Sequence, residues 1–301
     1  MKMSRLAALC MLLFLPLCNV FAEGARPSEP VALVYWLQGE ATLKVPSGEQ
    51  RPLRLFDRLP AGATVEVAPG SRLALAFANG HRYELRERSR ATLGAENLSL
   101  RSGPVRPLAS VPPLPRLLSI ADEEKPGLRA GAVRIRAERI MGLYPYQGTV
   151  TLAPATVLRF EPVEGGGMYR IEVHDRQGNL VFEAEAATSP VTLPPEALQP
   201  GMRYHWTVRT VERTRSVAKG KADFITLPRQ ATEAREALRK AIGEAGDSES
   251  LALLAEVDRS LGLWAEAHDG LRAAAQSVPG DTPLAAELAE IERLLPYLQS
   301  P

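Results

Sequence analysis

The run Leu198-Gln199-Pro200-Gly201-Met202-Arg203-Tyr204 decides how the middle of this 301-residue chain folds. Pro200-Gly201 favours a turn, and the residues after it alternate between polar and apolar. Tyr204, Trp206 and Val208 therefore share one face of a strand, and this placement indicates core residues rather than ligand contacts. The run predicts a turn that leads directly into a half-buried strand.

Further strand and turn signals surround this run between residues 142 and 228. Tyr169, Ile171 and Val173 share a strand face, and Asp175-Arg176-Gln177-Gly178 predicts a four-residue turn. The other predicted strands contain Val150 and Leu152, Val157 to Phe160, Val181 and Phe182, and Phe224. The stretch resembles fibronectin type III and related Ig-like sandwiches, whose tyrosine at such a turn bonds back to the loop backbone. The resemblance implies a β-sandwich for adhesion, spacing or binding, and it selects none of these roles.

Period-two alternation also dominates residues 31–107, and Asn79-Gly80 is a strong hairpin signal because both residues tolerate positive φ. The predicted strand faces are Val31, Leu33, Tyr35 and Leu37; Ala41, Leu43 and Val45; Val65 and Val67; Leu73, Leu75 and Phe77; Tyr83 and Leu85; and Leu98 and Leu100. Short strands at this spacing predict an all-β sandwich or barrel-like unit.

The same region resembles the FecR-like domain of bacterial envelope proteins. The residues that carry this resemblance are Gly39-Glu40-Ala41, Leu55 to Ala63, Pro69 to Leu75 and Asn79 to Leu85. Phe56-Asp57 stands where the family usually has Gly-Asp, and Asn79-Gly80 stands where it has Asp-Gly. The resemblance implies a β-rich interaction module in the envelope. The transmembrane signalling role of the family's best-known members is not carried over, because no matching membrane-spanning or cytoplasmic segment is recognised.

The apolar period lengthens to 3.6 residues over residues 229–301, which predicts four helices. Their apolar faces are Ala231 to Ala241, Leu251 to Leu261, Trp264 to Ala274 and Leu284 to Leu295. The middle pair resembles a tetratricopeptide repeat, although Asp258 stands where that pattern prefers an aromatic residue. Because such stacks need about three repeats to be stable alone, we expect this pair to pack on the sandwich or on a partner.

Residues 1–22 form a predicted secretory signal peptide, with Lys2 and Arg5 before an apolar run and cleavage after Ala22. A retained anchor is disfavoured because the run is shorter than a membrane span, and lipidation at Cys18 is disfavoured by the bulky Leu17. Both cysteines of the chain lie in this leader. We therefore expect a periplasmic or secreted protein without disulfides and without a membrane span after cleavage.

We predict that residues 108–141 form a partly structured linker. Val111-Pro112-Pro113-Leu114-Pro115 predicts a stiff, extended segment, whereas Val133 to Arg139 is compatible with a strand or a short helix. Basic residues outnumber acidic ones from Arg101 to Gly142, and acidic residues outnumber basic ones from Arg229 onward, although the net charge of the chain is only +1. We interpret the basic and acidic segments as two solvent-exposed faces. Alternatively, the two segments attract each other, or the basic segment contacts an anionic surface.

The residue types that carry chemistry are not arranged for catalysis in this sequence. His81, His174, His205 and His268 are scattered, and no HExxH spacing is found. Gly165-Gly166-Gly167 lacks the Lys-Ser/Thr of a phosphate loop, Ser216 to Lys219 falls in a predicted strand region, and the Asp175 turn lacks further calcium ligands. We predict no catalytic, cofactor-binding or metal-binding residue, and the partner-binding residues are not identified.

These observations predict an exported, non-enzymatic envelope protein that acts as a protein-binding or scaffolding module. Other envelope proteins are the expected partners, docking on the helical tail or on the FecR-like unit. A peptidoglycan- or glycan-binding wall module is the alternative, and an enzyme of unfamiliar type is a third class. Nucleic-acid binding is disfavoured by the near-neutral charge and by the absence of interleaved aromatic and basic residues.

Overall fold

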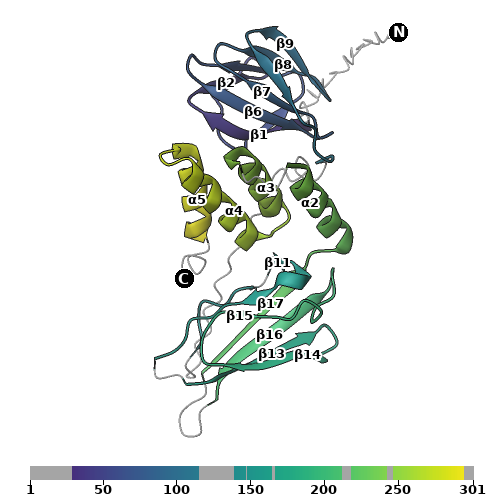
Figure 1. Cartoon of the computed structure of the whole chain (residues 1–301), viewed down its shortest axis with the longest axis vertical. Helices are drawn as coiled ribbons and strands as arrows, with labels where there is room; N and C mark the ends of the chain where they lie inside the picture. Colours follow the sequence, from purple (N-terminus) through teal and green to yellow (C-terminus); the bar gives the residue numbers. More distant parts are fainter. Residues whose placement is uncertain are drawn as a thin grey trace, which may run out of the picture.

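The computed structural model describes residues 29–114, 139–146, 148–164, 167–211, 218–242 and 247–294. It is mainly β, with several antiparallel sheets followed by four C-terminal helices (Figure 1). The predicted signal peptide, Val133 to Glu138, Gly165-Gly166 and Ser216-Val217 lie outside the described residues. Within the described ranges, no helix is long and apolar enough to cross a membrane.

Ten strands form the N-terminal β module, which we define as β1 to β10. They are β1 (Pro30–Gln38), β2 (Ala41–Lys44), β3 (Gln50–Pro52), β4 (Arg58–Pro60), β5 (Thr64–Val67), β6 (Arg72–Phe77), β7 (Arg82–Leu85), β8 (Arg90–Leu93), β9 (Leu98–Ser102) and β10 (Val105–Leu108). Two five-stranded sheets, ordered β10-β7-β6-β1-β4 and β3-β2-β5-β8-β9, pack face to face. Alternating apolar residues from both sheets fill the space between them, as the sequence predicts for a sandwich.

Strand β1 corrects one prediction, because its four predicted residues do not share a face. The register against β6 shifts between Val34 and Trp36, as a β-bulge produces. Leu33, Tyr35 and Trp36 consequently face outward towards the helices, whereas Leu37 faces the module's own core with Val34. The strand is buried on both faces, and such strands carry a continuous apolar run rather than a clean alternation.

The second β part, which we call the sandwich, follows the linker. Its elements are β11 (Thr149–Thr151), η1 (Ala153–Ala155), β12 (Val157–Leu158), β13 (Tyr169–Asp175), β14 (Leu180–Ala186), β15 (Val191–Thr192), β16 (Arg203–Thr210) and β17 (Lys219–Thr226). One sheet has the order β11-β17-β16-β13-β14, with β11 parallel to β17, and a small sheet pairs β12 with β15. The two sheets enclose a separate apolar core.

The turn before β16 has the geometry that the sequence predicts. The backbone N–H of Gln199 donates to the Tyr204 hydroxyl at 2.8 Å, and Tyr204 and Trp206 are both buried. The Trp206 indole donates to the carbonyl oxygen of Pro145 at 2.8 Å. Both aromatic side chains therefore belong to the core, with their polar atoms satisfied by backbone groups.

Four helices form the helical module: α2 (Arg229–Ile242), α3 (Ser248–Ser260), α4 (Trp264–Ser277) and α5 (Thr282–Leu294). The Asp247 side chain caps α3 by accepting from the Ser250 N–H at 2.9 Å, and Asp281 accepts from the Leu284 N–H in the first turn of α5. Gly262, at φ +79°, connects α3 to α4. The four predicted helices are thus all present.

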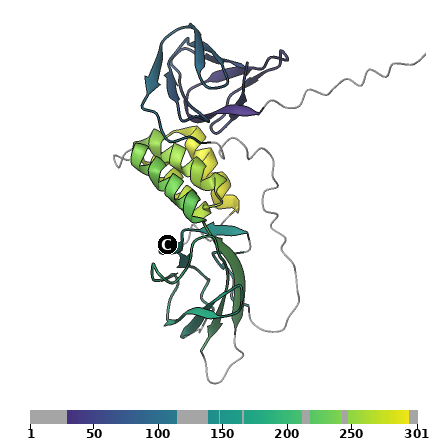
Figure 2. The same cartoon turned by 90° about the vertical axis from the view of Figure 1, so that its right-hand side faces the viewer.

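The helical module lies between the two β parts, as Figures 1 and 2 show. Apolar residues of α3 share a cluster with outward-facing residues of β1, while Leu263 and Ala231 pack with Val150 on the sandwich side. The sequence left open whether the α3–α4 pair packs on the sandwich or on a partner. In the structure it contacts the sandwich and the N-terminal β module together.

The first part of the predicted linker is fixed in place rather than extended freely. The N–H of Val111 donates to the carbonyl oxygen of Gly80 at 2.9 Å, and the N–H of Leu114 donates to that of Ala78 at 2.7 Å. Both side chains are buried in the cluster that joins β1 to the helices. Val111 and Leu114 therefore help to attach the helical module to the N-terminal β module. The proline-rich sequence around them does not predict this role.

Candidate functional site

The four histidines occupy three separate places. His81 lies in the turn before β7, and His268 is buried on α4 beside Asp269 and Arg272. His174 and His205 face each other across β13 and β16 with stacked rings whose centroids are 5.0 Å apart. The expectation that all four histidines are scattered is therefore wrong for His174 and His205. Within the part of the chain that the structure describes, no group of three or more metal-ligating side chains gathers.

The other predicted sites remain turns or strand ends. The Asp175 carboxylate accepts from the N–H groups of Gln177 and Asn179 at 2.8 and 2.9 Å, and its pKa is lowered chiefly by the Asn179 side-chain amide. Its oxygens are therefore engaged within the turn. Gly167 follows the two undescribed glycines, and Lys219 begins β17.

Buried polar chemistry concentrates instead where the helical module contacts the β parts. The outer face of the sheet β10-β7-β6-β1-β4 carries a small apolar surface that α3 covers, and we call it the α3-docking face. Its apolar members are Leu33, Tyr35, Trp36, Phe56, Ala74 and Ala76, and Arg58 and Arg72 lie at its sides. Ala252 and Leu253 of α3 belong to the same cluster. Burial raises the pKa of the Tyr35 hydroxyl to about 12.

On the β4 side of this face, a buried carboxylate lies between two arginines. Glu256 of α3 accepts from Arg58 at 3.2 Å and from Arg259 at 2.6 Å, and its side chain is fully buried. Burial raises the pKa of Glu256, and the two guanidinium groups oppose this effect. Arg259 also lies 5.7 Å from the ring of Phe56, which holds φ +63° in the left-handed region that favours glycine.

On the β6 side, Arg72 forms ion pairs with Glu249 of α3 and with Glu84 of β7. The same guanidinium lies 6.0 Å from the ring of Trp36. Among the described residues, no acceptor reaches the buried Trp36 Nε1–H or the buried Arg72 Nε–H. The buried Tyr35 hydroxyl also has no partner among the described residues, so three polar groups of this face are withdrawn from water without a hydrogen bond, which native interiors rarely tolerate.

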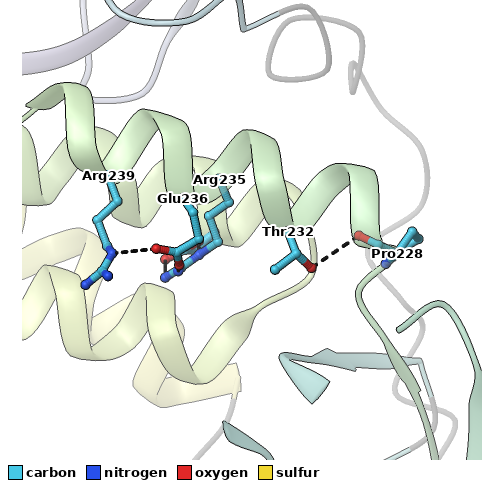
Figure 3. A network of polar contacts seen from close by, with 6 residues as sticks. Pro228, Thr232, Arg235, Glu236 and Arg239 are labelled. Carbon is cyan, nitrogen blue, oxygen red and sulfur yellow. Dashed lines mark hydrogen bonds and ion pairs between the residues drawn. The ribbon is translucent and has the colours of Figure 1, made fainter. Parts of the chain in front are cut away.

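Arg235 links α2 to α3 through a second buried ion pair. Its Nε and Nη2 donate to the two carboxylate oxygens of Asp258 at 2.5 and 2.8 Å. Figure 3 shows Arg235 next to Glu236, whose carboxylate also accepts a hydrogen bond from Arg239. In the first turn of α2, the Thr232 hydroxyl donates to the carbonyl oxygen of Pro228. Asp258, where the sequence resemblance leads one to expect an aromatic residue, thus forms a charge pair with Arg235 at this helix crossing.

On the sandwich side, α4 carries a half-buried acid, Glu266. Its Oε2 atom is buried and has no hydrogen-bond partner among the described residues. Burial raises its pKa to about 7; Asp258 adds to this shift and Arg235 opposes it. The buried Tyr144, whose pKa is also raised by burial, lies close enough for the two groups to interact electrostatically. The sequence offers no signal for this pairing, since the two residues are far apart in the chain.

Two hollows adjoin these contacts. An apolar hollow of about 220 Å³ lies between α2, α3 and Pro112 to Leu114, with Ala234, Leu238 and Leu261 in its wall. A more polar hollow of about 620 Å³ lies on the sandwich, where Met141, His205, Lys221 and Asp223 contribute to the wall. The first hollow has a mostly apolar lining, whereas the lining of the second includes His205, Thr207, Lys221 and Asp223.

No protein-family model and no curated protein matches this chain. Among solved structures, CopC from Methylosinus trichosporium OB3b is 24% identical over 30% of this chain and 94% of that chain, with a TM-score of 0.24. A tetra-tandem repeat from the extending region of a large adhesion protein is 12% identical over 65% of this chain and 42% of its own, with a TM-score of 0.22. A two-domain fibronectin type III segment from chicken tenascin is 11% identical over 66% of this chain and 94% of its own, also with a TM-score of 0.22. These TM-scores are too low to assign a function.

Proposed function

We propose that this chain is an exported, non-enzymatic envelope protein that binds other proteins and holds them in a fixed arrangement. In this proposal the N-terminal β module is FecR-like, the sandwich is of the fibronectin type III class, and α3–α4 is a tetratricopeptide-like hairpin. The periplasm or the cell exterior is the proposed location, after cleavage behind Ala22.

The observation that carries the proposal is the position of the helical module between the two β parts. It contacts β1 through α3 and the sandwich through Leu263 and Gly262, whose carbonyl accepts from the Val150 N–H at 3.4 Å. Such a wedge fixes the orientation of two β surfaces that would otherwise be joined only by a linker. A fixed pair of β surfaces suits a scaffold, whereas it adds nothing to the chemistry of an enzyme.

Site-specific photo-crosslinking in living cells tests this function. A photoreactive amino acid replaces the exposed Leu100 on β9 or the exposed Leu180 on β14, with Gln177 in the Asp175 turn as a control position. We expect a discrete crosslinked protein from Leu100 or Leu180 and none from Gln177. A folded protein that yields no discrete product at either position contradicts the proposal, and osmotic-shock release checks the location.

The glycan-binding alternative has one favourable observation of its own. The outer face of the sheet β3-β2-β5-β8-β9 carries neighbouring hydroxyls, with Thr64 and Thr92 3.3 Å apart and Arg101 donating to Thr92 at 3.3 Å. Lys44 and Arg90 border this polar face. Co-sedimentation with purified peptidoglycan at low salt tests it, with Lys44→Gln/Arg101→Gln as the variant. Absence of the wild-type protein from the pellet removes this alternative.

A further inference from the structure

We propose that His174 and His205, together with Asp223, form a binding site for a divalent transition-metal ion such as Zn²⁺ on the outer face of the sandwich. This inference goes beyond the proposed protein-binding function and does not depend on it. The expectation that no residue of this chain binds a metal was based on scattered histidines, and the structure brings two of them together.

The three side chains lie in one row across neighbouring strands. In the register of the large sandwich sheet, His174 of β13 is opposite His205 of β16, and His205 is opposite Asp223 of β17 (Figure 1). Val173 and Phe224 belong to the sandwich core, and successive strand residues point to opposite faces, so the row lies on the outer face. Cβ atoms of directly opposite residues are about 5 Å apart, which lets two imidazoles reach one ion at about 2 Å from each nitrogen.

The histidine pair offers a ligand atom that no protein group uses. The Nδ1 atom of His174 is buried and has no hydrogen-bond partner among the described residues. The ring of His205 stacks on that of His174, with an angle of 10° between the ring planes. A buried polar atom without a partner is uncommon in native proteins, and a metal ion would supply the partner that this nitrogen lacks. Imidazole nitrogens and a carboxylate oxygen are ligands that Zn²⁺ prefers.

The surroundings of the pair leave room for an ion and for the movement that its binding requires. His205 and Asp223 line the hollow of about 620 Å³ on the sandwich. Two parallel rings cannot both direct an in-plane lone pair at one ion, so at least one ring must turn when the metal binds. Both imidazoles are only half-buried and Asp223 is exposed, so these side chains can change rotamer. Since no three metal-ligating groups gather among the described residues, we expect Asp223 to turn towards the pair and water to complete the coordination.

The rest of the chain provides internal controls. Residues 23–301 contain no cysteine, so no thiolate competes for the ion after the predicted cleavage. His81 is exposed in the turn before β7, and His268 is buried on α4, so neither belongs to the row. Lys221 is exposed two residues before Asp223 on the same strand face, and its positive charge opposes the binding of a cation there.

Isothermal titration calorimetry of the untagged chain from residue 23 to 301 with Zn²⁺ tests the proposal. We expect one ion per chain, and no binding of Mg²⁺ or Ca²⁺, which prefer oxygen ligands. His174→Ala and His205→Ala should each weaken Zn²⁺ binding at least about tenfold, because losing a group that only orients a ligand already costs about tenfold. His81→Ala should leave the affinity unchanged. Lys221→Gln should tighten binding about threefold, since it removes a nearby positive charge.

Nuclear magnetic resonance of the wild-type chain identifies the ligands without a substitution. We expect Zn²⁺ to shift the imidazole ¹⁵N resonances of His174 and His205 and to leave those of His81 and His268 in place. Circular dichroism checks the folding of each variant, and where an alanine variant fails to fold, these resonances decide. The proposal is overturned if about 1 mM Zn²⁺ does not bind. It is also overturned if the folded His174→Ala/His205→Ala chain keeps the wild-type affinity, or if the shifts are confined to His81 and His268.

Discussion

The helical module is attached to its two β neighbours by different chemistry. Towards the N-terminal β module, α3 brings Glu249 and Glu256 against two arginines. Towards the sandwich, the apolar contacts are few, and the half-buried acid Glu266 forms no ion pair with an arginine among the described residues. The sandwich is joined to α2 through only Leu227 and Pro228, whereas the N-terminal β module is far from α3 in sequence. Ion pairs thus stabilise the contact between α3 and the N-terminal β module, which no short covalent connection holds together.

Removing the paired carboxylate breaks the charged contact and has the largest expected effect. Glu256→Gln removes the buried anion that the half-buried Arg58 and Arg259 contact, and we expect a loss of about 3 kcal/mol in the free energy of unfolding. Urea unfolding followed by ¹⁹F NMR of fluorotryptophan measures it, because Trp36, Trp206 and Trp264 report on the N-terminal β module, the sandwich and the helices in turn. A loss below about 1 kcal/mol would show that the pair is not a main attachment.

The same substitution on the sandwich side should act in the opposite direction. The folded pKa of Glu266 is about 7 and its ordinary value is 4.5, so the folded state binds the proton more tightly between these values. Stability from this group is fully present below the lower value and is lost as the pH rises through 7, by up to about 3 kcal/mol. Glu266→Gln should therefore stabilise the protein near pH 8 and flatten this part of the pH dependence. Parallel pH curves for wild type and variant would contradict it.

The backbone connection between α3 and α4 tests the sandwich contact itself. A Cβ atom at Gly262 would lie 3.0 Å from a Val150 methyl group, and φ is +79°. Gly280 has φ +90°, and a Cβ atom added there would meet no neighbour within 4 Å. A substitution at Gly280 therefore introduces the same backbone strain as one at Gly262 but no clash with a neighbouring side chain. We expect Gly280→Ala to cost about 1 kcal/mol and Gly262→Ala about 2 kcal/mol. Equal losses in thermal unfolding would show that Val150 accommodates the methyl group.

Sequence reasoning succeeded where the apolar period reports burial directly. The alternation around Tyr204 predicted both the strand and the core position of its aromatic residues, and the longer period after residue 229 predicted all four helices. It failed on β1, where burial on both faces hides a bulge near Trp36. A strand that packs on two partners loses the alternation on which the prediction depends.

The candidate site was invisible to sequence because its residues are joined only by the packing of distant elements. Phe56 contacts Arg259 of α3 and Asp258 pairs with Arg235 of α2, so the partner of each residue lies on another element. The amino-acid sequence does not distinguish a glutamate on a solvent-exposed helix face from a glutamate that pairs with an arginine of another element.

Salt dependence gives the smallest and most selective test of the difference between the two contacts. Arg72 is about one-third exposed on its side chain, so its pairs with Glu249 and Glu84 are partly screened, and Arg72→Gln should cost only about 1 kcal/mol. High salt screens such pairs, so about 1 M NaCl should reduce the difference between wild type and Arg72→Gln. The same salt should leave the Gly262→Ala difference unchanged, because an apolar contact has no charge to screen. Fluorine signals of Trp36 and Trp264 measure both differences in one titration. If salt alters the two differences equally, the N-terminal contact is held by apolar burial, and its arginines contribute only specificity.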